Sequence, residues 1–442
     1  MAQSARLDKL KSDLHAPLTQ HDALVEADRC YFCYDAPCID ACPTGIDIPL
    51  FIRQIKTGNS TVAAKTIFDE NIFGGMCARV CPTETLCEQK CVRNVGEEKP
   101  VLIGQLQRFA TDSLMATGKQ PYTKAVQRDT RVAIVGAGPA GLACAHRLAL
   151  YGHQVSVFDA KPKPGGLNEY GIAAYKTVDS FAAKEVDYIM SIGGIELKPN
   201  TAIGEKLTLD ELKSDYDAVF LGMGLGGVNV LGIAGEDLPA VENAVGFISR
   251  LRQSSDLSSL QSEIGRNVIV IGGGMTAIDA AVQAKHLGAE NVTVVYRREQ
   301  SAMNASAFEQ KLAQKSGVLI RTNLQATEFL EAAGVLHKTC FEYTESINGK
   351  LTGTGEMLSI ESDQVLVAIG QSMQSVVMQG SRATVSMNSG RIEVDENRRS
   401  SDKSVWAGGD CIAGGDDLTV SAVQDGKLAA ESIHQTLENA HG

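Results

Sequence analysis

Residues 131–150, RVAIVGAGPAGLACAHRLAL, decide the fold of this chain. An apolar run that fits a buried parallel strand leads into a glycine-rich turn, and a helix pattern follows. Gly136, Gly138 and Gly141 hold the G-x-G-x-x-G positions, which allow a tight turn, close approach of a pyrophosphate and close packing of helix on strand. The next strand ends in Asp159, an acid placed to bind ribose hydroxyls. This order predicts a dinucleotide-binding unit.

The same unit occurs a second time in the stretch NVIVIGGGMTAIDAA. Gly272, Gly274 and Ala277 occupy the G-x-G-x-x-G/A positions. The strand that follows ends in Arg297 and Arg298, where the first unit ends in an acid. Two complete units with different strand ends predict two different dinucleotides. We therefore expect an α/β protein with two Rossmann-like, doubly wound domains.

Two further strand patterns, residues 218–224 and 364–370, end in glycine. They predict the two crossings between a nucleotide domain that is split in the sequence and another that is inserted into it. Near the end of the chain, Asp410 follows a short strand in the stretch SVWAGGDC. An aspartate there suits a hydrogen bond to the ribityl chain or pyrophosphate of a flavin, and an ordinary turn aspartate is the alternative.

The N-terminal part of the chain is rich in cysteine. Eight of the eleven cysteines precede residue 92, in the runs C-x2-C-x4-C-x3-C and C-x3-C-x5-C-x3-C. Short runs that end in Cys-Pro hold cubane clusters in ferredoxin-like domains, so two [4Fe–4S] clusters are the leading prediction. Zinc is the alternative, but structural zinc usually takes paired C-x2-C knuckles and only one occurs here. The eight are Cys30, Cys33, Cys38, Cys42, Cys77, Cys81, Cys87 and Cys91.

Composition limits the class of protein. The chain has 442 residues, a net charge of −12 and a pI near 5.2, which argues against nucleic acid or an anionic membrane as its main partner. Its first residues contain no apolar signal region, and no run of eighteen apolar residues occurs. We therefore expect a cytoplasmic protein, where clustered cysteines are more often metal ligands or redox groups than disulfides.

Taken together, these motifs resemble those of the glutamate synthase small subunit and the N-terminal part of dihydropyrimidine dehydrogenase. The resemblance runs from about residue 27 to the end, through the cysteine-rich head, G-A-G-P-A-G, P-G-G-L at 164–167, G-G-G-x-T-A, Y-R-R and the final G-G-D. It implies that electrons pass from a nicotinamide through FAD into two [4Fe–4S] clusters. The cofactor contacts that it implies beyond those above are Gly166, Leu167, Lys176 and Thr276.

The resemblance also implies which residues hold each cluster. In dihydropyrimidine dehydrogenases, three cysteines and a glutamine from an I-G-x-L-Q motif bind one cluster. Here the stretch IGQLQRF places Gln107 sixteen residues after the last cysteine of the runs. Cys77 is then a bystander. The implied ligand sets are Cys30, Cys33, Cys38 and Cys91 for the first cluster, and Cys42, Cys81, Cys87 and Gln107 for the second.

We therefore expect three parts: a helical iron–sulfur head (1–125), a split FAD domain (126–238 and 366–442) and an inserted NAD(H) domain (239–365). The bacterial two-subunit dihydropyrimidine dehydrogenases resembled here use NADH. They imply a partner subunit with FMN and iron–sulfur clusters that reduces uracil or thymine to the 5,6-dihydro product, in a heterotetramer. Because the cofactors carry the hydride chemistry, we expect no catalytic acid, base or nucleophile in this chain.

Several alternatives stay open. An NADPH-dependent glutamate synthase small subunit or a related ferredoxin reductase is one, since Arg297 and Arg298 suit a 2′-phosphate. A zinc-stapled interaction protein without enzymatic activity is another. Many relatives carry an aspartate at the position of Met275, and Asp279 is the candidate to replace it in contacting the nicotinamide amide or ribose. Lys176 is expected to steady the reduced flavin, with an exposed loop lysine as the alternative.

Overall fold

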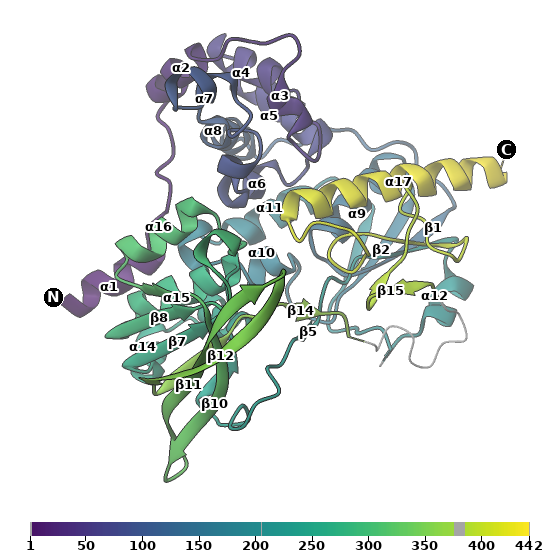
Figure 1. Cartoon of the computed structure of the whole chain (residues 1–442). Helices are drawn as coiled ribbons and strands as arrows, with labels where there is room; N and C mark the ends of the chain where they lie inside the picture. The colour runs from purple at the N-terminus through teal and green to yellow at the C-terminus, as the bar shows by residue number, and fades with distance from the viewer. Residues whose placement is uncertain (1, 205, 375–384, 442) are drawn as a thin grey trace. The chain divides into compact units, whose positions relative to one another are not determined.

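The structure of the chain, a computed structural model, describes residues 2–204, 206–374 and 385–441 (Figure 1). It divides into two compact units, each built from separate stretches of sequence. Unit 1 comprises residues 1–14, 170–179 and 227–372, and unit 2 comprises residues 15–169, 180–226 and 373–442. The cysteine-rich head and the first nucleotide fold thus share unit 2, whereas residues 1–14 and 170–179 join unit 1.

A five-stranded parallel sheet in the order β17-β4-β1-β2-β3 forms the centre of unit 2. Strand β1 (Arg131–Val135) is buried over its last four residues, which explains its unbroken apolar sequence. Helix α9 (Pro139–Leu150) follows β1 and packs on α17 (Thr419–His441). The other elements are β2 (Gln154–Phe158), α10 (Leu167–Tyr170), α11 (Phe181–Met190), β3 (Ile195–Lys198), α12 (Leu209–Asp215), β4 (Ala218–Leu221), β15 (Met387–Asn388), β16 (Arg391–Ile392) and β17 (Val405–Ala407).

The head of unit 2 is helical. Helix α4 (Ile48–Lys56) buries Ile48, Phe51, Ile52 and Ile55, whose spacing of three, four and seven residues places them on one face. Helices α5 and α6 both pack on α8. The remaining helices are α2 (Gln20–Asp28), α3 (Pro37–Asp40), α5 (Ser60–Glu70), α6 (Gly74–Val80), η1 (Thr83–Thr85), α7 (Val92–Glu97) and α8 (Ile103–Met115).

Unit 1 contains the second five-stranded parallel sheet, in the order β6-β13-β7-β8-β9, and an antiparallel sheet in the order β10-β11-β12. Helix α15 (Met275–Leu287) follows β7 (Asn267–Ile271), and α1 (Ala2–Lys11) packs on α15. The others are η2 (Ala174–Lys176), β5 (Gly227–Val228), β6 (Val241–Asn243), α13 (Ala244–Gln253), α14 (Leu257–Glu263), β8 (Asn291–Val295), η3 (Gln300–Ala302), α16 (Ala307–Lys315), β9 (Leu319–Arg321), β10 (Leu324–Ala332), β11 (Val335–Ile347), β12 (Lys350–Glu361), β13 (Gln364–Val367) and β14 (Gln371–Ser372).

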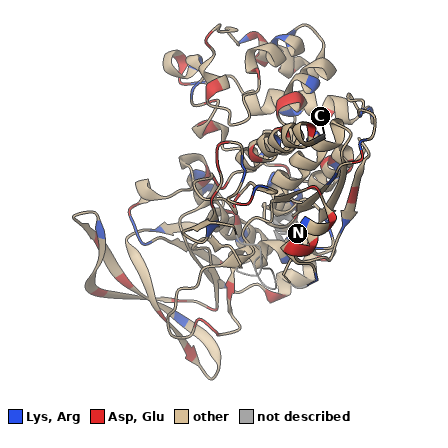
Figure 2. Cartoon of the chain, turned by 90° about the vertical axis from the view of Figure 1, so that its right-hand side faces the viewer, with Lys and Arg blue, Asp and Glu red and all other residues tan. Residues whose placement is uncertain are grey.

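These elements confirm the predicted fold class. A helical head precedes two Rossmann-type sheets, and residues 227–372 of unit 1 interrupt unit 2 between residues 226 and 373. Figure 2 shows that acidic and basic residues occur on elements throughout the chain. Within the described residues, no helix has the length and apolar character needed to cross a membrane.

Candidate cofactor and cluster sites

The first glycine loop joins β1 to α9. Gly136 has a φ of +101°, and a Cβ there would lie 2.3 Å from the carbonyl oxygen of Gly222. A Cβ at Gly141 would lie 1.9 Å from the carbonyl oxygen of Gly136. At Gly138, the N-cap of α9, the nearest atom to an added Cβ is the Cα of Gly166 at 3.8 Å. Packing therefore requires two of these glycines, and the third leaves the positive end of the helix open to a phosphate.

Asp159 and the P-G-G-L segment lie against this loop. The Oδ2 atom of Asp159 accepts a hydrogen bond from the N–H of Ala137 at 2.6 Å. Burial raises the pKa of Asp159, against the hydrogen bonds that it accepts. Gly166 has a φ of +56°, and a Cβ there would lie 2.7 Å from the Cα of Gly138, while Leu167 begins α10. Asp159 thus holds the loop itself, and its contact with a ribose stays a prediction.

Asp410 comes to the same region from the far end of the chain. A Cβ at its neighbour Gly409 would lie 3.1 Å from the Cβ of Ala140, in the first turn of α9. Burial and the charge of Asp417 raise the pKa of Asp410 to about 6, although Arg391 opposes them. Unit 2 therefore gathers the first glycine loop, Asp159, Gly166 and Asp410 at the carboxyl ends of its parallel strands, where open α/β sheets bind nucleotides.

The second glycine loop lies in unit 1, between β7 and α15. Gly272 has a φ of +151°, and a Cβ there would lie 2.3 Å from the carbonyl oxygen of Ala368. Gly274 is the N-cap of α15 and has no atom within 4 Å of an added Cβ. Thr276 is half-buried in the first turn of the helix, and Ala277 is fully buried. This loop repeats the plan of the first: one glycine is required by packing and another leaves the helix N-terminus open.

Arg297 and Arg298 follow β8 in unit 1. Both are exposed, and neither forms an ion pair with a carboxylate in the part of the chain that the structure describes. A guanidinium of Arg298 lies 3.5 Å from the hydroxyl of Tyr296, whose ring packs against Gly273 of the loop. The end of β8 therefore offers two uncompensated positive charges close to the second loop, and their contact with a nucleotide stays a prediction.

Lys176 lies largely buried within unit 1, with its side chain 11% exposed. Its Nζ lies 2.8 Å from Oδ1 of Asp279 on α15 and 2.9 Å from Oε1 of Glu309 on α16. Burial lowers the pKa of Lys176, and the two carboxylates together raise it above its usual range. Asp279 also accepts a hydrogen bond from the hydroxyl of Tyr175 at 2.8 Å. The contact of Lys176 with a flavin stays a prediction, and two carboxylates already share the charge that this contact would use.

The first predicted cysteine set converges in the head of unit 2. Cys30, Cys33, Cys38 and Cys91 line one pocket with apolar neighbours from α4 and α8. Burial, together with the thiols of Cys30 and Cys91, raises the pKa of Cys38 to about 12. No three His, Cys, Asp or Glu side chains of the described residues lie close enough to hold a single metal ion. Four thiols around one apolar pocket form the donor set that a cubane cluster requires.

The cysteines of the second set also meet. A hydrogen bond with Cys77, burial, and the neighbouring thiols of Cys87 and Cys42 raise the pKa of Cys81. Cys77 lies one helical turn before Cys81 and is 2% exposed, so its thiol joins this group although the resemblance leaves it out. Three predicted ligands and the predicted bystander are thus neighbours.

Gln107 lies on α8, buried to 8% exposure. Its Nε2 donates a hydrogen bond to the carbonyl oxygen of Gly74 at 2.7 Å, which fixes the orientation of the amide because a carbonyl only accepts. Its Oε1 accepts no hydrogen bond from any residue that the structure describes. The amide nitrogen is therefore engaged, and the oxygen, the atom that binds a metal, is free.

Two glutamates hold the start of α8, and sequence reasoning missed both. Oε1 of Glu26 accepts a hydrogen bond from the N–H of Leu102 at 2.9 Å, and Oε1 of Glu88 accepts one from the N–H of Gly104 at 3.0 Å. Burial raises the pKa of Glu88, although the backbone N–H bonds that Glu88 itself accepts oppose the rise. The first N–H groups of a helix have no partner inside it, so these carboxylates position the helix that carries Gln107. Neither glutamate precedes α8 at capping distance, so no local signal indicated them.

Two family models match the chain. The model of pyridine nucleotide-disulphide oxidoreductases matches residues 130–426, and that of dihydropyrimidine dehydrogenase domain II, 4Fe-4S cluster, matches residues 7–119. The NAD-dependent dihydropyrimidine dehydrogenase subunit PreT of Salmonella typhimurium is 36% identical over 100% of this chain and 99% of its own length. The small chain of NADPH glutamate synthase from Escherichia coli is 33% identical over 96% of this chain and 94% of its own. The chain belongs to the family of PreT subunits and glutamate synthase small chains.

Solved structures that resemble this PreT-family chain show its fold. FprA from Mycobacterium tuberculosis in complex with NADPH has a TM-score of 0.60 at 20% identity, covering 71% of this chain and 86% of its own. Thioredoxin reductase from T. acidophilum has a TM-score of 0.53 at 21% identity, covering 69% and 98%. Residues 240–365 contain Cys340 as their single cysteine, so a thioredoxin reductase C-x-x-C is absent from the sequence of the second nucleotide segment.

Proposed function

We propose that this chain is the electron-input subunit of an NAD-dependent dihydropyrimidine dehydrogenase. One observation carries the proposal. Gln107 stands at the position that dihydropyrimidine dehydrogenases use for a cluster ligand, with its nitrogen bound to Gly74 and its oxygen free. The atom that a metal would bind is therefore left without a protein partner among the described residues, as a ligand role requires.

The residues assign distinct tasks to the two units. Gly136, Gly138 and Gly141 admit the pyrophosphate of FAD to the N-terminus of α9, with Asp159 and Asp410 beside it. The second loop of unit 1, with Thr276, binds NADH, and the arginines after β8 are suited to a 2′-phosphate on the nicotinamide nucleotide. FAD supplies the step between a two-electron hydride and carriers that accept one electron at a time. The chain itself positions these groups and excludes water, and no proton-transferring side chain is required.

We propose that Cys30, Cys33, Cys38 and Cys91 hold the first [4Fe–4S] cluster, and that Cys42, Cys81, Cys87 and Gln107 hold the second. The shared pocket of the first four cysteines and the proximity of Cys42, Cys81 and Cys87 support this division. Cys77 is the competing ligand, because it is a neighbour of Cys81. Replacement separates the two: Cys77→Ala should retain eight irons per chain with an unchanged low-temperature EPR spectrum, whereas Gln107→Ala should change the signal of one cluster.

The partner is a subunit with FMN and iron–sulfur clusters that reduces uracil or thymine to the 5,6-dihydro product, in a heterotetramer. The word subunit in the names of the PreT relatives supports a multi-chain enzyme. Location in the cytoplasm stays a prediction from the sequence.

Anaerobic reduction tests the proposal. The purified chain is mixed with NADH or NADPH, and spectra are followed from the flavin to the iron–sulfur region, before and after addition of the pyrimidine-reducing subunit and uracil. We expect NADH to bleach the flavin, and uracil to be consumed only with the partner present. Strong preference for NADPH, with uracil untouched by an active partner, would refute the proposal.

A second candidate is an NADPH-dependent glutamate synthase small chain or a related ferredoxin reductase. The observation that favours it is the pair of uncompensated arginines, Arg297 and Arg298, which suit a 2′-phosphate. The anaerobic reduction with NADH and NADPH distinguishes the two candidates, because this one requires a preference for NADPH.

A further inference from the structure

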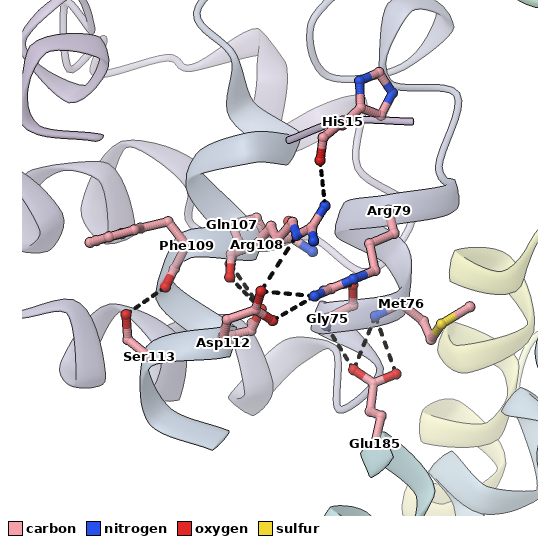
Figure 3. A network of polar contacts seen from close by, with 11 residues as sticks. His15, Gly75, Met76, Arg79, Gln107, Arg108, Phe109, Asp112, Ser113 and Glu185 are labelled. Atoms are coloured by element: carbon pink, nitrogen blue, oxygen red, sulfur yellow. Dashed lines mark hydrogen bonds and ion pairs between the residues drawn. The ribbon is translucent and has the colours of Figure 1, made fainter. Parts of the chain in front are cut away.

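A single peptide group connects the candidate ligand Gln107 to a buried carboxylate on another element of unit 2. Gln107 donates to the carbonyl oxygen of Gly74 at 2.7 Å. The N–H of the same peptide group, that of Gly75, donates to Oε1 of Glu185 at 2.8 Å. The N–H of Met76 donates to the same oxygen at 3.0 Å. Figure 3 shows Glu185 reaching the start of α6 from α11. Amide, peptide and carboxylate thus form one continuous hydrogen-bond chain.

The packing around this hydrogen-bond chain leaves no room for a side chain at Gly74 or Gly75. A Cβ on Gly75 would lie 2.6 Å from Oε1 of Glu185 and 2.6 Å from the ring of Phe181, and a Cβ on Gly74 would lie 2.5 Å from a methyl group of Ile67. Only glycine lets the start of α6 approach both α11 and α5. Glycine at positions 74 and 75 therefore permits the close approach on which the hydrogen-bond chain depends.

Glu185 is fully buried and forms no ion pair with any residue that the structure describes. Arg79 of α6, whose charge acts on Glu185, instead binds both oxygens of Asp112 on α8 at 2.9 and 2.8 Å (Figure 3). Burial raises the pKa of Glu185 to about 8, although the N–H bonds and the charge of Arg79 oppose it, and Asp112 adds to the rise. A buried carboxyl without a counter-charge is costly, so its presence requires a reason beyond packing.

We propose that Glu185 is a positioning residue for the second cluster: through the Gly74–Gly75 peptide it orients the Gln107 amide and increases the electron density on its oxygen. The inference rests on the proposed role of Gln107 as a ligand. Hydrogen bonds in series polarise one another, so a carboxylate at one end makes the Gly74 carbonyl a better acceptor and the Gln107 oxygen a better donor to iron. Carboxylates that orient metal-bound histidines act in the same way.

The test is an EPR-monitored redox titration of the cluster-loaded chain at pH 9, above the pKa of Glu185, with iron content measured in parallel. Glu185→Gln keeps an oxygen that accepts the N–H bonds and removes the charge. We expect it to retain both clusters and to shift the reduction potential of the second cluster upward, since less electron density then reaches the iron. Asp187→Asn removes a charge from the exposed face of the same helix and should leave the potential unchanged, because water screens that site.

Gln107→Ala distinguishes a failure of the proposed role of Glu185 from a failure of the ligand assignment of Gln107. If Gln107→Ala changes the potential of the second cluster and Glu185→Gln does not, the role of Glu185 is refuted and Gln107 remains a ligand. If Gln107→Ala leaves spectrum and potential unchanged, the ligand assignment itself fails.

A titration of the unmodified chain decides the matter if Glu185→Gln does not fold. The potential of the second cluster should then fall between pH 6.5 and pH 9, as Glu185 loses its proton beside Arg79 and Asp112. A potential that is independent of pH over this interval would refute the role of Glu185.

Discussion

Replacement of Lys176 by methionine should destabilise unit 1 without affecting unit 2. The ammonium lies 2.8 Å from Asp279 and 2.9 Å from Glu309, and the side chains of these acids are 5% and 7% exposed. Methionine fills a similar volume but leaves two carboxylates buried without a cation. Removing one partner of a buried ion pair costs about 3–5 kcal/mol of unfolding free energy, and loss of two pairs places this variant at the upper end.

Two optical probes distinguish the units during urea unfolding. The only tryptophan, Trp406, is 1% exposed in β17 of unit 2, so its fluorescence reports that unit, while far-UV circular dichroism reports both. At pH 7.5 the lysine is charged in the folded and the unfolded chain, so the whole effect should appear. We expect a new early transition by circular dichroism and an unchanged fluorescence transition.

The matched control is Lys311→Met, which removes an exposed lysine from α16 of the same unit and should have little effect. Lys176→Arg, which keeps the charge, should recover part of the loss. A change below about 1 kcal/mol for Lys176→Met would show that the buried ion pairs do not hold residues 170–179 on α15 and α16, and would refute the reasoning.

Three further predictions concern the cofactor residues. Gly141→Ala should fold poorly and lose FAD, because its Cβ would lie 1.9 Å from a carbonyl oxygen. Gly138→Ala has no atom closer than 3.8 Å to its Cβ, so it should keep its thermal midpoint and lose FAD because the methyl group blocks the pyrophosphate. Equal thermal midpoints for the two variants would contradict this. Folding raises the pKa of Asp410 to about 6, so the stability of the wild-type chain should fall as pH rises from about 4 to 6. In urea unfolding, Asp410→Asn should therefore stabilise the FAD-free chain by ~1–3 kcal/mol at pH 7.5 but not at pH 4. Equal effects at both pH values would refute this prediction. Arg298→Ala should raise the KM for NADPH about tenfold and leave that for NADH unchanged, and equal changes would exclude a 2′-phosphate contact.

The fold followed from local patterns. A parallel strand buried on both faces must be apolar throughout, and a backbone that turns at Gly136 with a φ of +101° accepts only glycine, so both requirements are visible in the sequence. The cysteine runs are local in the same sense, because their spacing reflects ligands supplied by short loops and single helical turns. Such features can be predicted because the residues that satisfy them are close neighbours in the chain.

Other features depended on contacts between distant segments. Nothing near Lys176 in the sequence indicates that its charge meets Asp279 and Glu309, and no motif connects Glu185 to the peptide between Gly74 and Gly75. Two nucleotide folds, a cysteine-rich head and the candidate ligands could all be predicted from local sequence patterns. Which buried charges face each other, and which amide oxygen is free, became evident only from the packed structure. Burial and pairing depend on how separate elements pack, and hydrogen-bond partners are set by distance in space.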